Sequence, residues 1–338
     1  MPPTLHLDFS NPADLSRAAT LLRDGGLVAF ATETVYGLGA NALSGAFVAR
    51  IFAAKQRPSW DPLIVHLASV EQVSQVALVP EELAGRVAAL ADAFWPGPLT
   101  LLLPRSSAVP DAVTAGRELV GVRVPAHPAA RALLAAAGVP VAAPSANLFG
   151  HTSPTTAAHV LADLDGRIDA VLDAGPTSIG VESTVLDPMQ TPMVLYRPGA
   201  VTVAQLTAVT GVAVEVFVPT TEAQPASMPS PGVGIRHYAP RARLVLVEGP
   251  LAALQAALAA ARGGKIGVLL PADWALKGEA VIQGWGRWDD PEALAAGLFA
   301  GLRALDDLGV AVILCPLPEA GGIRDAIRDR LEKAARTA

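Results

Sequence analysis

Short apolar runs alternate with amphipathic segments of helical spacing along most of the chain. Asn11-Pro12 is a typical helix start and Gly25-Gly26 a typical stop, which predicts a helix from residue 11 to 24. Further helices are expected over 46–55, 81–94 and 127–137 and around Gln205. Strands are expected over 27–31, 63–67, 99–103, 119–124, 140–143, 170–172, 184–186 and 194–196, with an extended stretch over 212–218. This mixture predicts an α/β domain with a large mixed sheet.

Residues 219–242 lack periodicity and are rich in Pro, Gly, Ser and Thr. A loop longer than about 12–15 residues is uncommon unless it is a linker or has a function. A second α/β pattern follows, with strands expected over 244–247, 266–270 and 310–314 and helices over 251–262, 291–308 and 323–335. These strands are nearly continuous apolar runs, as in a small parallel sheet covered on both faces. We therefore expect a first domain over 1–208, a linker over 209–242 and a smaller domain over 243–338.

The composition of the chain narrows its class. Hydrophobic residues make up 51% of the 338 positions and charged residues 17%, so the chain can bury a large core. No apolar run approaches the roughly 20 residues that span a bilayer, and the N-terminus lacks the pattern of a secretory signal. A single cysteine, Cys315, excludes a disulfide framework. These features predict a cytoplasmic protein without a membrane partner. The net charge of −6 is unfavourable for gripping a nucleic-acid backbone.

Three common motifs are incomplete. Gly263-Gly264-Lys265 is followed by Ile266 instead of Ser or Thr, so it is not a phosphate-binding P-loop. Gly37-Leu38-Gly39 lacks the third glycine of a dinucleotide-binding fingerprint. The six histidines do not have the spacing of metal ligands, so a zinc site is not expected.

Four polar segments follow expected strands or helices. They are Thr32-Glu33-Thr34-Val35-Tyr36-Gly37-Leu38-Gly39, Lys55-Gln56-Arg57-Pro58, Ala143-Pro144-Ser145-Ala146-Asn147, and Gly180-Val181-Glu182-Ser183-Thr184 with Tyr196-Arg197-Pro198-Gly199. Taken singly, each is compatible with a simple turn or helix end. Lys55 is the only lysine among the first 264 residues, and Lys and Arg at an exposed helix end could instead clamp phosphates.

Taken together, in this order and at these separations, the segments resemble the YrdC-like family, in particular its long two-domain form, the threonylcarbamoyl-adenylate synthases. The strings W-P-G-P-L-T and V-x-V-R-x-P belong to the same pattern. Ser230-Pro231-Gly232 and Arg236-His237-Tyr238-Ala239-Pro240 resemble the inter-domain motif of the family, with Val233-Gly234-Ile235 in place of its usual M-x-Y portion. The resemblance implies a YrdC-like twisted mixed sheet with helices, followed by a smaller Rossmann-like parallel α/β domain.

The resemblance also implies an activity. The family joins L-threonine, bicarbonate and ATP to give threonylcarbamoyl-AMP and pyrophosphate, and a separate tRNA threonylcarbamoyl transferase uses the product. Such chemistry depends mainly on positioning and on stabilising phosphate charge. Mg²⁺ would accompany ATP and be held largely by the nucleotide, with no metal site built from protein side chains. Any contact with tRNA would be indirect or weak.

Matching the family motifs residue by residue gives an expected site. Lys55, Arg57, Ser145 and Asn147 would act on the phosphates and be the catalytic groups. Thr32, His66, Arg123, Ser183 and Thr184 would bind threonine, with Arg123 on its carboxylate, and Ser153, Arg197 and Tyr238 would complete the ATP site. Tyr238 would close over the nucleotide as part of a lid, although it could instead only pack against the second domain.

Two other functions fit parts of this pattern. One is an RNA-binding YrdC-like module without synthase activity, which the acidic balance disfavours. The other is a carbamoyl transferase of the hydrogenase-maturation type. That class carries cysteine zinc motifs, which a chain with one cysteine cannot form.

Overall fold

The computed structural model describes residues 3–218, 228, 230 and 238–336. These residues form two compact units. The first lies within 1–149, 154–178 and 182–234, and the second within 150–153, 179–181 and 235–338. Short segments around residues 150 and 180 thus belong to the second unit although they lie within the first part of the sequence.

The first unit is built on a mixed sheet, which in the described part of the chain has the order β1-β8-β2-β3-β7-β4-β6-β5-β9-β10-β11. The strands are β1 (Leu5–Asp8), β2 (Val28–Ala31), β3 (Tyr36–Asn41), β4 (Ile64–His66), β5 (Leu99–Pro104), β6 (Leu119–Arg123), β7 (Val141–Ala142), β8 (Ala170–Asp173), β9 (Thr184–Asp187), β10 (Met193–Arg197) and β11 (Val214–Val216). The sheet contains parallel pairs such as β4 with β6 and antiparallel pairs such as β2 with β3.

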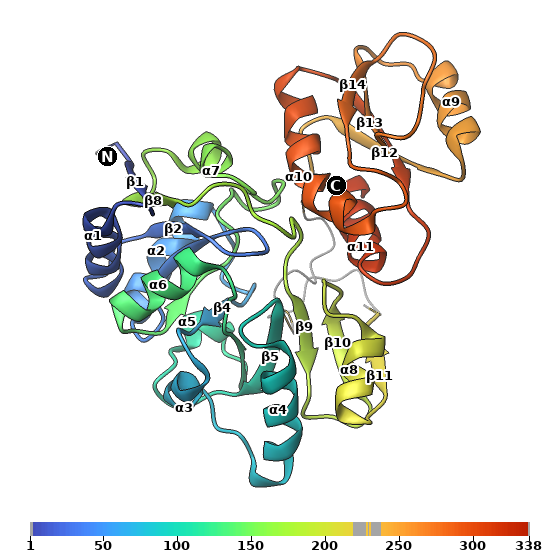
Figure 1. Ribbon diagram of the computed structural model, residues 1–338. Helices are drawn as coiled ribbons and strands as arrows, with labels where there is room; N and C mark the ends of the chain where they lie inside the picture. Colours follow the sequence, from blue (N-terminus) through green and yellow to red (C-terminus); the bar gives the residue numbers. More distant parts are fainter. Residues whose placement is uncertain (1–2, 219–227, 229, 231–237, 337–338) are drawn as a thin grey trace. The chain divides into compact units, whose positions relative to one another are not determined.

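Helices cover both faces of this sheet (Figure 1). They are α1 (Pro12–Arg23), α2 (Gly45–Lys55), α3 (Val73–Val76), α4 (Glu81–Phe94), α5 (Asp111–Thr114), α6 (Pro128–Ala137), α7 (Ala157–Leu164) and α8 (Val203–Thr210). On β2, Val28 and Phe30 pack into the core beneath α1 and α6, whereas Ala29 and Ala31 belong to the core on the α2 side. The two-residue period of a strand explains this division between the faces.

The second unit contains a parallel sheet of order β12-β15-β13-β14. Its elements are β12 (Arg243–Glu248), α9 (Leu251–Ala260), β13 (Ile266–Leu270), β14 (Val281–Gly284), α10 (Pro291–Asp307), β15 (Val312–Leu317) and α11 (Arg324–Ala335). Within this unit, Figure 1 shows α9 on one side of the sheet and α10 and α11 on the other. The fold class expected from the sequence, a large mixed sheet with helices plus a smaller parallel α/β unit, is therefore confirmed.

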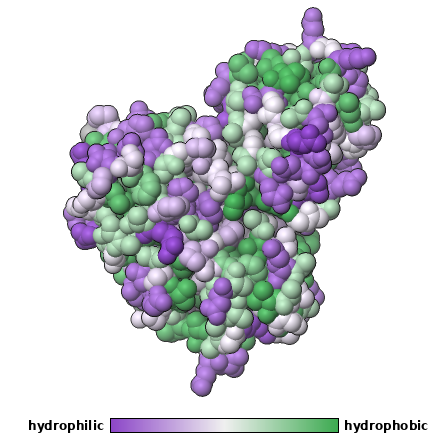
Figure 2. Space-filling view, in the orientation of Figure 1, coloured by the Kyte–Doolittle hydropathy of each residue, from purple (hydrophilic) through white to green (hydrophobic). Residues whose placement is uncertain are grey.

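Most expected elements are present, with boundaries within a few residues of those predicted. The sequence pattern missed β1, β3, α7 and β14 and the short helices α3 and α5, and β15 begins two residues later than expected. No helix in the described part of the chain is both long and apolar enough to cross a membrane. Figure 2 shows hydrophilic and apolar residues intermixed over the visible surface of each unit.

Candidate functional site

Lys55, the last residue of α2, is buried and not exposed as its place at a helix end suggested. Its ammonium nitrogen donates to the carbonyl of Ser145 at 2.6 Å and to the carbonyl of Asn147. The loop after β7 therefore covers the helix end, and Phe149 N donates back to Lys55 O at 2.9 Å. Burial lowers the pKa of Lys55 well below its ordinary value, and the Arg57 charge acts in the same direction.

Arg57 is also buried, which again corrects the expectation of an exposed clamp. Its guanidinium forms an ion pair with Asp61 at 2.9 Å and donates to the carbonyls of Asp61 and Pro62 at 3.2 and 2.9 Å. The guanidinium carbon also lies 5.9 Å from the ring centroid of Phe149. The structure thus places Lys55 against the loop of Ser145 and Asn147, and Arg57 beside Phe149, which follows that loop. Both cations already have protein partners.

A second group of predicted residues gathers at the ends of β2, β4 and β6. His66 and Arg123 are the last residues of the parallel strands β4 and β6 and stand side by side in the register. Thr32 follows β2, and its hydroxyl lies 2.8 Å from that of Thr34 and donates to Val35 O at 2.6 Å. Arg123 Nη1 donates to Thr34 Oγ1 at 3.0 Å. Thr32, His66 and Arg123 are therefore brought together, with Thr34 joining two of them.

Glu33 belongs to this group, although the sequence analysis did not select it. Its Oε1 lies 2.6 Å from Arg123 Nη2, and both side chains are buried. Burial opposes ionisation of this carboxyl, but the Arg123 charge and hydrogen bonds outweigh it and hold its pKa below the ordinary value. A signal was available in the sequence, since an acidic residue between two threonines needs a cationic partner if the segment is buried.

His66 is held as a neutral imidazole. Burial, with a further contribution from the Arg123 charge, lowers the pKa of His66 to about 3. The ring packs edge-on against Phe30 with centroids 6.3 Å apart. Among the described residues, its Nδ1 has no hydrogen-bond partner. A neutral imidazole with an unused polar atom in a buried site can accept or donate a hydrogen bond to a bound molecule.

Ser183, Thr184 and Arg197 form a third group on β9 and β10. Arg197 donates from Nε to Ser183 O at 3.0 Å and from Nη2 to Ser183 Oγ at 3.1 Å. Ser183 Oγ also lies 2.8 Å from Thr100 Oγ1 on β5. The Thr184 hydroxyl donates to Val201 O at 2.7 Å and accepts from Val201 N, so it contributes to the structure of its own loop.

Ser153 and Tyr238, the remaining predicted residues, belong to the second unit. Ser153 is completely buried. The ring of Tyr238 packs 5.7 Å from that of Phe299, and the guanidinium of Arg330 lies over it at 5.3 Å. This is the packing that the alternative interpretation of Tyr238 expected. Other residues of the inter-domain segment, among them Pro231, Gly232, Gly234, Arg236 and His237, lie outside the described residues.

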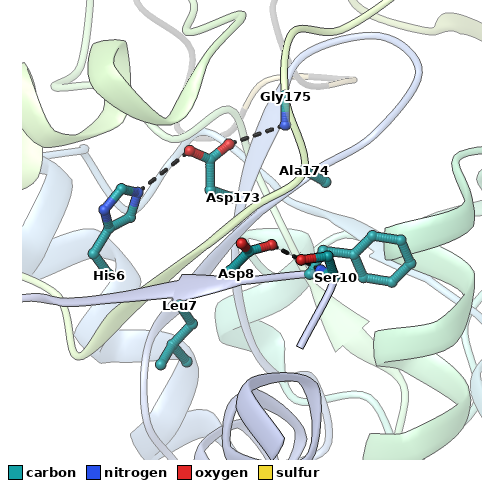
Figure 3. Close-up of a pocket in the computed structure, with 8 residues that line it drawn as sticks. His6, Leu7, Asp8, Ser10, Asp173, Ala174 and Gly175 are labelled. Carbon is teal, nitrogen blue, oxygen red and sulfur yellow. Dashed lines mark hydrogen bonds and ion pairs between the residues drawn. The ribbon is translucent and has the colours of Figure 1, made fainter. Parts of the chain in front are cut away.

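An open cavity of about 570 Å³ lies away from all these groups, at the carboxyl ends of β1 and β8 (Figure 3). Its lining includes His6, Asp8 and Asp173, and His6 Nε2 lies 3.3 Å from Asp173 Oδ2. None of the predicted site residues lines it. In the described part of the chain, no three His, Cys, Asp or Glu side chains are placed to hold a metal ion.

Comparison with known proteins identifies two matching family models. The first, Sua5_yciO_yrdC, described as telomere recombination, matches residues 20–199. The second, described as the C-terminal domain of threonylcarbamoyl-AMP synthase, matches residues 201–336.

Named relatives match over nearly the whole chain. A threonylcarbamoyl-AMP synthase of Pyrococcus abyssi is 43% identical over 325 residues, which cover 94% of this chain and 93% of that protein. One of Bacillus subtilis is 43% identical over 331 residues, covering 96% and 94%.

Solved structures agree with the sequence relatives. P. abyssi Sua5 complexed with L-threonine superposes with a TM-score of 0.88 at 40% identity, over 98% of this chain and 97% of that one. E. coli YciO, at 22% identity and a TM-score of 0.51, covers 61% of this chain and shares the fold alone. The chain therefore belongs to the Sua5/YciO/YrdC family, in the two-domain form that carries the C-terminal domain of the threonylcarbamoyl-AMP synthases.

Proposed function

We propose that this protein is an L-threonylcarbamoyladenylate synthase, which joins L-threonine, bicarbonate and ATP and releases pyrophosphate. The observation that carries the proposal is the 43% identity to proteins named threonylcarbamoyl-AMP synthase, which extends over both units. The L-threonine complex of P. abyssi Sua5, at 40% identity, supports threonine as the amino-acid substrate. The product would then be passed to a separate tRNA threonylcarbamoyl transferase.

The threonine subsite would be the group around Arg123. A guanidinium suits a carboxylate because two parallel N–H donors match its two oxygens. The neutral His66 and the hydroxyls of Thr32 and Ser183 would contact the polar atoms of the amino acid. These groups are buried, so water would be largely excluded and their hydrogen bonds strengthened.

The phosphate subsite would be the loop that joins Lys55 and Arg57 to Ser145 and Asn147. An ammonium has three donors, and the two contacts to carbonyls leave one for a phosphate oxygen. An arriving phosphate would raise the pKa of Lys55, because a nearby anion favours the charged form. The motif match also assigns Ser153, Arg197 and Tyr238 to ATP binding.

Mg²⁺ would enter with the nucleotide. The side chains around the phosphate loop fit this role, because Ser145 and Asn147 offer neutral oxygens of the kind that Mg²⁺ accepts alongside phosphates and water. The ion would neutralise phosphate charge, while the residues of the chain orient the nucleotide and the amino acid.

The proposal predicts strict dependence of the reaction on its substrates. Pyrophosphate release from ATP should require L-threonine and bicarbonate together, and mass spectrometry of the quenched reaction should detect threonylcarbamoyl-AMP. Serine should react about 10–200-fold less efficiently, since a missing methyl group in a fitted pocket costs roughly 1–3 kcal/mol. Equal pyrophosphate release without any amino acid would contradict the proposal. In that case, salt-titrated binding to tRNA would test the RNA-binding alternative.

A further inference from the structure

Glu33 is the one acidic side chain that contacts Arg123 in the described part of the site. The contact is short, at 2.6 Å from Oε1 to Nη2, and both side chains are buried. A buried ion pair is costly to form unless further hydrogen bonds satisfy the remaining atoms of both partners. The other hydrogen bonds of Glu33 and Arg123 therefore indicate the role of the ion pair.

The second oxygen of Glu33 is held by backbone. Oε2 accepts hydrogen bonds from Ala126 N at 3.1 Å and His127 N at 3.3 Å, just before α6 begins at Pro128. His127 is the N-cap of that helix, so the carboxylate also lies at its positive end. Glu33 is thus anchored on one side to a rigid element, and its other oxygen is presented to Arg123.

Arg123 is held at three points and retains free donors. Nε donates to Gly97 O at 3.2 Å, Nη1 to Thr34 Oγ1 at 3.0 Å and Nη2 to Glu33 Oε1. A guanidinium has five N–H groups, so one on each terminal nitrogen has no partner among the described residues. Two N–H groups are the number that a bidentate carboxylate requires.

We infer that Glu33 is a positioning residue that fixes the Arg123 guanidinium in the orientation that receives the carboxylate of the amino-acid substrate. Glu33 also balances the Arg123 charge in the buried site before the substrate arrives. The inference rests on the proposed function, since it assigns the carboxylate of L-threonine as the ligand of Arg123. Glu33 itself does not contact the substrate and acts through Arg123.

The test compares Glu33→Gln and Glu33→Asp with the unmodified full-length protein. The amide keeps the shape but loses the charge, and Asp keeps the charge but is one methylene too short to reach both Arg123 and the amides before α6. Both variants should raise the KM for threonine by roughly 10–100-fold, as expected for loss of orientation. The KM for ATP should change less than threefold. KM does not depend on how much of a preparation is folded, so a partly unfolded variant can still be assessed.

A control separates positioning at the site from the general loss of a carboxylate that holds an arginine, and the partly exposed Asp169 provides it. Asp169 also joins an arginine to a backbone amide, through Arg50 at 2.9 Å and Leu27 N at 2.6 Å, outside the predicted site. Asp169→Asn should leave the KM for threonine unchanged. Arg123→Ala should raise it strongly, and adding Glu33→Gln to Arg123→Ala should cause little further change, because coupled residues are not additive.

The outcomes are distinguishable. If the unmodified protein shows no threonine dependence, the proposed function fails. The positioning role is tested only once the unmodified protein shows threonine dependence. It is wrong if Glu33→Gln and Glu33→Asp keep the normal KM for threonine, or if they raise the KM for threonine and the KM for ATP equally. Full additivity of Glu33→Gln and Arg123→Ala would also overturn it.

Discussion

At the scale of single residues, Lys55 shows how far burial changes the meaning of a motif. A lysine at a helix end looks exposed in the sequence, but here its ammonium joins the end of α2 to the loop of Ser145 and Asn147. Gln56 makes this possible by adopting a left-handed conformation, with φ of +52°, which ends the helix. The lysine therefore supports the loop that the motif assigns to phosphate binding, in addition to any contact of its own with phosphate.

Lys55→Met should therefore be both less stable and less active. The substitution leaves two buried carbonyls without a donor, at about 1–3 kcal/mol each. Lys55→Arg should also be destabilised, because a larger head group must fit a filled site, at about 1–3 kcal/mol. Thermal unfolding measures the loss of stability of each variant, and the KM for ATP measures the loss of nucleotide binding.

Lys265→Met is the control for this prediction. Lys265 also donates to a backbone carbonyl, Leu308 O at 2.7 Å, but at an exposed position in the second unit. Its replacement should change stability by less than about 0.5 kcal/mol. If Lys55→Arg is as stable and active as the unmodified protein, the requirement for a compact charge at this position is wrong.

At the scale of elements, β3 is the strand that the sequence hid. It begins directly after Val35 and contains two glycines. Glycine is unfavourable within a strand, so the sequence of this segment predicts a turn instead. The structure explains Gly39, since a Cβ there would lie 2.8 Å from Val141 Cγ1 and 2.9 Å from Phe30 Cε1. The glycine allows β2, β3 and β7 to lie close together.

Gly39→Ala should therefore destabilise the protein by about 1–3 kcal/mol, the usual cost of overpacking. Gly85→Ala is the matched control, because Gly85 lies within α4 and a Cβ there meets nothing within 4 Å. That substitution should stabilise by about 0.5–1 kcal/mol, since alanine is the better helix former. Chemical denaturation of both variants measures the difference. Equal effects of the two substitutions would show that a Cβ at position 39 fits without a steric clash, which contradicts this explanation of Gly39.

The sequence predicted the regular part of the fold well and the site only partly. Long amphipathic helices such as α4 carry a local signal and were placed correctly. Short elements such as α7 and edge strands such as β1 and β14 depend on tertiary partners, which a local pattern does not contain. The motif match selected Arg123 and His66, whose proximity the strand register bears out. It did not select Glu33: the sequence indicates that a buried acidic residue needs a cationic partner, but it does not show which arginine that partner is.

At the scale of the whole molecule, the second unit uses segments from the first part of the sequence. Arg303 on α10 donates from Nη2 to Thr152 O within this unit. Gly180, with φ of +79°, lies so close to α10 that a Cβ would be 2.4 Å from Ala295 O. A cut near Val218 would therefore remove the partners of residues 150–153 and 179–181. Full-length variants are the better test of what the second unit contributes.

Tyr238 offers that test. The motif predicts that Tyr238 closes over the nucleotide as part of a lid, which would exclude water and protect the acyl-adenylate. In the structure its ring packs against Phe299 and Arg330, so Tyr238→Ala would remove packing as well as any contact with ATP. Loss of a buried aromatic ring costs about 3–5 kcal/mol, which would mask a functional effect. Tyr238→Phe is the sharper variant, because it keeps the ring and removes only the hydroxyl.

If Tyr238 contacts the nucleotide through its hydroxyl, Tyr238→Phe should unfold at nearly the normal temperature. It should also raise the KM for ATP by about 5–30-fold, the equivalent of one lost hydrogen bond of roughly 1–2 kcal/mol. The ratio of trapped threonylcarbamoyl-AMP to pyrophosphate should fall, because a weakened lid lets the intermediate hydrolyse. Phe299→Leu disturbs the same packing without touching the hydroxyl, so it should lower stability and leave that ratio unchanged. If Tyr238→Phe matches the unmodified protein in both the KM and the ratio, the hydroxyl has no part in catalysis, and a role through the hydroxyl is wrong.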